Sequence, residues 1–205
     1  MRLLVCLGYM LGCTISPVHA ASHKFTVLSE IVLHRGLNHV EGFAADGRAA
    51  DILKAWRDNG NAHGYNLFVV TLPDDRFNSA WNIVGTQQGS EPLLDTVRDD
   101  PHTVEDVVRS VRFAHGRIDG RVATLMLVAT REGSVGDGLP APAPVTYQVF
   151  ELARVADCCG TPDVFRLVAT EHSDRPYCNA DRAVSQRFGI APPAEYQGSD
   201  KPDGC

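Results

Sequence analysis

The chain has 205 residues and carries 19 basic against 25 acidic side chains, which gives a formal net charge of −6. This length suffices for one domain with a sizeable hydrophobic core and is short for two domains. The acidic balance leaves no broad basic face for contacting phosphates, so we expect no nucleic-acid partner.

Residues 1–20 have the pattern of a secretory signal peptide. A charged start precedes a short apolar run, and residues 18–20 supply small side chains at the −3 and −1 positions of a cleavage site. The run is too short to span a membrane, so we expect no integral membrane segment after the signal is removed. The mature chain, 21–205, is predicted to be a periplasmic or secreted, soluble single β-rich domain. A lipoprotein acylated at Cys13 is the alternative.

Strand signals dominate the first half of the mature chain. β-branched and apolar residues predict strands over 25–34, 65–72 and 81–84, and Pro73 is expected to end the second of them. The segment 49–57 also has apolar residues at helical spacing. Because an Asp-Gly pair precedes this segment and an Asn-Gly pair follows it, we favour a strand there too.

The second half predicts a long hairpin over 107–130, turned at Asp119-Gly120, and further strands over 145–152 and 164–170. One helix follows, with Asn179 as its N-cap and Gly189 at its end. These elements predict an α+β fold that is mostly antiparallel β, a sandwich or a strongly curved sheet, with one C-terminal helix.

Four cysteines are expected in the exported chain, and all lie in its last quarter. They are Cys158, Cys159, Cys178 and Cys205. An even number in an oxidising compartment predicts two disulfides that tie down the C-terminal region, whereas adjacent cysteines are poorly spaced for zinc. We expect one of the adjacent pair to bond Cys178 and the other to bond Cys205. Cys205 could instead stay free or link two chains into a homodimer.

The sequence contains none of the familiar catalytic motifs. G-x-S-x-G, S-x-x-K, H-E-x-x-H, the P-loop and G-x-G-x-x-G are all absent from the 205 residues. We therefore expect no cofactor and favour a protein that is not an enzyme. Catalysis stays open, because triads are defined by geometry rather than by sequence position.

Two polar clusters are the candidate ligand-binding sites. The first offers Asp58, Asn61 and His63 between two strands, although Asn and Asp residues are also typical of a hairpin turn. The second offers Asp99, Asp100 and His102, which could bind a hard metal ion or act as a general base, or could form a solvated turn. We predict that the two clusters face the same side of the molecule. Such a mixture of groups suits an anionic or metal-bridged ligand, and the metal is left open.

Two runs carry a family resemblance: AWRDNGNAHGY at residues 55–65 and DVVRSVRF at residues 106–113. With the export signal and the β-rich domain, they resemble a group of small exported proteobacterial proteins, the carbapenem intrinsic-resistance proteins. The resemblance covers roughly residues 25–195. It implies a periplasmic protein that protects by a non-hydrolytic route, and it assigns no functional residues.

We therefore expect an exported, non-enzymatic binding or protective protein whose partner is an unknown small molecule or another exported protein. One alternative is a metal-dependent hydrolase that uses His63, His102 and nearby carboxylates. Another is an inhibitor or assembly partner of a second exported protein.

Overall fold

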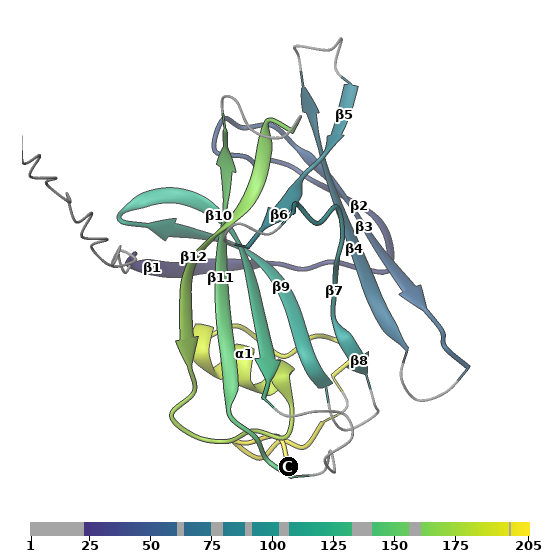
Figure 1. Ribbon diagram of the computed structural model, residues 1–205, viewed down its shortest axis with the longest axis vertical. Coiled ribbons are helices and arrows are strands. Elements are labelled where there is room, and N and C mark those ends of the chain that lie inside the picture. Colours follow the sequence, from purple (N-terminus) through teal and green to yellow (C-terminus); the bar gives the residue numbers. More distant parts are fainter. Residues whose placement is uncertain are drawn as a thin grey trace, which may run out of the picture.

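A computed structural model describes residues 23–60, 64–74, 80–88, 92–102, 107–132, 141–155, 161–196 and 198–205. Within these residues, the strands form two sheets, and one helix follows them near the C-terminus (Figure 1). The expected α+β fold, mostly antiparallel with a C-terminal helix, is confirmed.

The larger sheet has seven strands in the described part of the chain. Its main path runs in the order β1 (Phe25–Ile31), β9 (Val107–Ile118), β10 (Arg121–Arg131), β11 (Val145–Arg154), β12 (Asp163–His172) and β6 (Gly85–Gln87), while β8 (Asp100–His102) pairs with β9. Neighbouring strands are antiparallel except for the short parallel pairing of β6 with β12.

The smaller sheet has five antiparallel strands among the described residues. Its order is β2 (Gly36–Val40), β3 (Ala50–Arg57), β4 (Tyr65–Asp74) and β5 (Ala80–Ile83), and β7 (Val97–Arg98) pairs with β4. The segment 49–57, which could also have been a helix, therefore forms strand β3, as we favoured.

Two apolar cores give the molecule three layers. Strand β10 shows why: Met126 and Val128 belong to the core between the two sheets, whereas Leu125 and Leu127 belong to the core beneath the helix. Alternate residues of a strand point to opposite faces, so one strand serves both cores. The helix α1 (Ala180–Phe188) thus covers one face of the larger sheet, and the smaller sheet covers the other.

Local signals form the hairpin and the helix as predicted. Asp119 and Gly120 both have positive φ angles, 48° and 82°, which is the backbone that a tight two-residue turn requires. Asn179 accepts hydrogen bonds from the first turn of α1, and Gly189 ends the helix in the left-handed conformation.

Pro73 does not end its strand, contrary to expectation. Strand β4 continues to Asp74, and Pro73 pairs with Trp81 of β5. The pairing of β4 with β3 stops at Thr71, so Pro73 has no strand partner on the β3 side. Its carbonyl points to that side and accepts a hydrogen bond from Arg48. The missing N–H of proline lies on the same side, so it removes no ladder hydrogen bond to β5.

The predicted disulfide pairing is wrong for both Cys178 and Cys205, because neither bonds a cysteine of the adjacent pair. Cys178 bonds Cys205 directly, with Cα atoms 5.1 Å apart. The chain returns after α1, and the Cys178 amide donates to the Asp203 carbonyl at 2.9 Å, which brings the two cysteines together. Cys158 and Cys159 lie outside the described residues. Among those residues, no helix is long and apolar enough to cross a bilayer.

Candidate functional site

Strand β9 has a gap along one edge, where β1 leaves the larger sheet. The pairing with β1 ends at Phe113, and the pairing with β8 begins at Arg109. In the described chain, residues 110–112 thus have no strand partner on this edge. The gap forms because the chain after Ile31 crosses over to start the smaller sheet.

A cavity of about 430 Å³ opens at this gap, between the two sheets. Its third wall is the segment 191–195, here called the C-terminal strap, which follows α1. Phe68 of β4 and Phe113 of β9 form part of the lining, with ring centroids 5.9 Å apart. A volume of this size, with apolar walls and a few polar groups, is typical of small-molecule sites.

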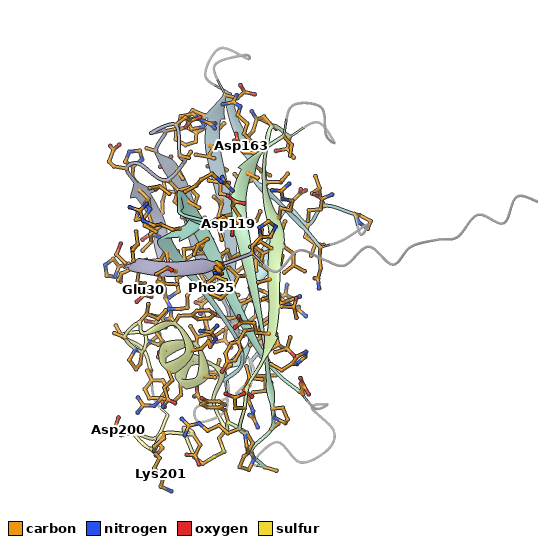
Figure 2. All side chains as sticks on the ribbon, turned by 90° about the vertical axis from the view of Figure 1, so that its left-hand side faces the viewer. Phe25, Glu30, Asp119, Asp163, Asp200 and Lys201 are labelled. Atoms are coloured by element: carbon orange, nitrogen blue, oxygen red, sulfur yellow. A yellow bond between two sulfur atoms is a disulfide. The ribbon has the colours of Figure 1, made fainter. Side chains whose placement is uncertain are left out.

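Arg112 is a buried cation in the wall of the cavity. Its Nε donates to Glu30 at the end of β1 at 2.7 Å, and its Nη2 donates to the same carboxylate and to the Ala191 carbonyl. Figure 2 shows Glu30 on the strand that crosses directly above α1. The Arg112 Nη1 atom is buried and has no hydrogen-bond partner in the described part of the chain.

Asn66 supplies the complementary group from the smaller sheet. It is 2% exposed, and Asp99 holds it through two hydrogen bonds, one from its backbone amide at 2.6 Å and one from its side-chain Nδ2 at 2.8 Å. Its Oδ1 atom is buried and unpaired among the described residues. Buried polar atoms are nearly always hydrogen-bonded, so Arg112 Nη1 and Asn66 Oδ1 are exceptions within the described part of the chain.

The C-terminal strap is held to the smaller sheet by an ion pair and to the larger sheet by a hydrogen bond. Lys54 of β3 is buried and forms an ion pair with Glu195, while Arg112 of β9 donates to Ala191. Partial burial raises the pKa of the Glu195 carboxyl, but the hydrogen bond and charge of Lys54 outweigh burial and hold this pKa below its usual value. The strap is therefore anchored by a carboxylate that stays charged at neutral pH.

Arg35 extends the cavity wall toward β3, where its guanidinium lies over the ring of Trp56, 4.7 Å from the centroid. A Cβ atom at Gly64 would lie 2.2 Å from the same ring. Glycine is thus required at the start of β4 for the Trp56 ring to occupy its position.

The structure describes only some of the predicted site residues. Asp99 lines the cavity and holds Asn66, whereas Asp58 accepts from the Gly60 amide at 2.8 Å in its own turn and is not part of the lining. Asn61 and His63 lie outside the described residues. Asp100 and His102 belong to β8, and their side chains also lie outside the described part. The shared site therefore stays a prediction.

The described residues hold no group of three or more potential metal ligands. Because His63 and the side chain of His102 are outside that part of the chain, the hypothesis of a metal-dependent hydrolase stays untested.

The sequence analysis did not predict Lys54, Asn66 or Arg112 as site residues. The strand patterns around Asn66 and Lys54 nevertheless indicate that these two are unusual. Asn66 shares its strand face with Phe68 and Val70, and Lys54 shares its face with Ile52. A polar residue at an inward position of an alternating strand is expensive to bury, so it marks a site or a buried contact.

Comparisons with known proteins support the fold alone. No family model matches the chain, and no curated protein matches it. The crystal structure of CarG matches with a TM-score of 0.61 at 18% sequence identity, and the match covers 78% of this chain and 95% of that chain. At this identity, the likeness means that the two chains share an architecture.

Proposed function

We propose that this chain is an exported, non-enzymatic binding protein that protects its host by a non-hydrolytic route, and that the inter-sheet cavity is its binding site. The observation that carries the proposal is the cavity of about 430 Å³ between the two sheets, which Phe68, Phe113, Asn66 and Arg112 help to line. These four residues belong to strands β4 and β9, which is how binding groups are held in place.

Two further observations support the carbapenem-related part of the proposal. The runs at 55–65 and 106–113 resemble carbapenem intrinsic-resistance proteins. The fold is that of CarG, a protein with a carbapenem-related name. Export is part of the same proposal, because a protective protein of this kind acts outside the cytoplasm.

The test is carbapenem protection of a susceptible bacterial host. Expression of the full chain should raise the minimal inhibitory concentration of a carbapenem, and the version that lacks residues 1–20 should not. The intact mass of the periplasmic protein should correspond to a chain that begins at Ala21. The purified protein should leave the carbapenem chemically intact during a long incubation.

The alternatives give different results in the same experiment. Loss of the carbapenem together with a stoichiometric transition metal in the purified protein would replace the proposal with the hydrolase that uses His63 and His102. Co-purification with one exported protein, without any protection, would favour the inhibitor or assembly partner.

A further inference from the structure

One cation of the cavity wall differs from the other charged side chains that line it. Besides His34, the ionisable lining residues are the carboxylates Glu30, Asp99, Asp181 and Glu195 and the cations Arg35, Lys54 and Arg112. Each carboxylate already accepts from a donor of the protein, and two of these donors are the buried cations Lys54 and Arg112. Within the described part of the chain, Arg35 is thus the lining cation that forms no ion pair with a carboxylate.

The guanidinium of Arg35 is held in position without the use of its N–H donors. It lies over the ring of Trp56, 4.7 Å from the centroid, and the absence of a side chain at Gly64 leaves the space that this ring occupies. A cation over an aromatic ring contacts the face of that ring, so the donors at the edge of the guanidinium stay available. These donors form a rigid fork that matches the two oxygens of a carboxylate.

The corner of the cavity around Arg35 is positive. Burial raises the pKa of the Glu195 carboxyl, but the hydrogen bond and charge of Lys54 lower this pKa, and the charge of Arg35 lowers it further. One carboxylate therefore faces two cations, and one positive charge remains. Asp99 and Asp181 are only 5% and 4% exposed, whereas Arg35 is exposed to solvent. An anion that enters from solvent thus meets Arg35 before the buried carboxylates.

We propose that the cavity binds a small carboxylate that has an apolar body. The ligand carboxylate pairs with Arg35 at the rim, and the apolar body packs inside against Phe68 and Phe113. At the rim the carboxylate keeps part of its hydration, which avoids the high cost of a fully buried ion. This inference rests on the proposed function, since it takes the cavity to be the binding site and names the class of its ligand.

The space and the walls of the cavity agree with this ligand class. A volume of about 430 Å³ exceeds what a few bridging waters would fill. Pro192 and Pro193 of the C-terminal strap add an apolar surface to the two phenylalanine rings. The ligand is thus expected to have an apolar body of the size of one aromatic ring or larger.

A matched pair of probes tests the charge preference on the mature protein. Hippurate and hippuramide have the same N-benzoylglycine skeleton and differ in a carboxylate against a neutral amide. Binding of each is followed by isothermal titration and by changes in backbone amide chemical shifts. We expect hippurate to bind about tenfold more tightly than hippuramide, with shift changes at the cavity wall, because a hydrogen bond between charged groups is stronger than one to a neutral group.

Two substitutions test the role of Arg35. Arg35→Gln removes the cation and should weaken hippurate binding by about tenfold, while hippuramide binding stays within about twofold. Arg57→Gln is the matched control, since Arg57 is an exposed residue next to Trp56 in β3 and is not part of the cavity lining. Both variants lose one positive charge, so a general attraction of the anion would affect them equally. The control should bind both probes like the unmodified protein.

The inference is overturned if neither probe binds, if hippuramide binds as tightly as hippurate, or if Arg35→Gln binds hippurate like the Arg57→Gln control. Since the comparison of the two probes uses the unmodified protein, it decides the question even if a variant does not fold. These results leave the cellular protection test untouched, so a failure here is distinct from a failure of the proposed function.

Discussion

Replacement of Arg48 by methionine should lower the free energy of unfolding by about 3–5 kcal/mol. Arg48 lies between β2 and β3 and makes a bidentate ion pair with buried Asp163, the first residue of β12, at 2.8 and 2.9 Å. It also donates to the Pro73 carbonyl of β4. One guanidinium therefore joins the two sheets, and its loss leaves a buried carboxylate without its cation.

The hydrogen bonds from Arg48 to Asp163 raise the pKa of the guanidinium, so the charge is permanent at any working pH. The measurement is urea unfolding of the oxidised protein, with Arg117→Met as the control. The control should change stability by less than about 0.5 kcal/mol, because Arg117 is exposed. The double variant Arg48→Met with Asp163→Leu should regain part of the loss. An Arg48→Met variant as stable as the control would contradict the role of this ion pair.

Removal of the Cys178–Cys205 disulfide by two serine substitutions should cost about 3–4 kcal/mol, the loop-closure contribution for a sequence separation of 27 residues. The closed loop contains α1 and the C-terminal strap. Gly204 lies close to Asn179, so the disulfide also holds the end of the chain against the start of the helix. The loss should therefore loosen the wall of the cavity as well as the helix.

Urea unfolding measures the cost, and hydrogen exchange of residues 190–196 measures the loosening. The substitutions are preferred to a reductant, which would act on Cys158 and Cys159 as well. Non-reducing peptide mapping of the unmodified protein should recover the Cys178 and Cys205 peptides joined. Either peptide joined to Cys158 or Cys159 would contradict the pairing.

The elements that the sequence predicts well are those with local signals. The turn at Asp119-Gly120 and the caps of α1 at Asn179 and Gly189 each depend on a few neighbouring residues. A positive φ angle and an N-cap hydrogen bond are properties of one turn of chain, so the pattern contains the information.

The cavity and the disulfide partner depend on long-range geometry. The gap beside Arg112 exists because β1 pairs with β9 only as far as Phe113 and β8 pairs with it only from Arg109. No local pattern encodes that spacing. Likewise, Cys205 reaches Cys178 because the chain folds back after α1. The inward positions of Asn66 and Lys54 were readable from alternation, but only the fold shows that they line the same cavity.

The most direct test is the cellular protection given by cavity variants at matched periplasmic levels. Arg112→Lys and Asn66→Leu change two residues that line the cavity, and Arg117→Lys changes an exposed residue on the strand of Arg112. If the cavity is the binding site, both cavity variants lose carbapenem protection although they reach the periplasm folded and at the level of the control, and the control protects fully. Full protection by both cavity variants, at the level of the control, would contradict the proposed site.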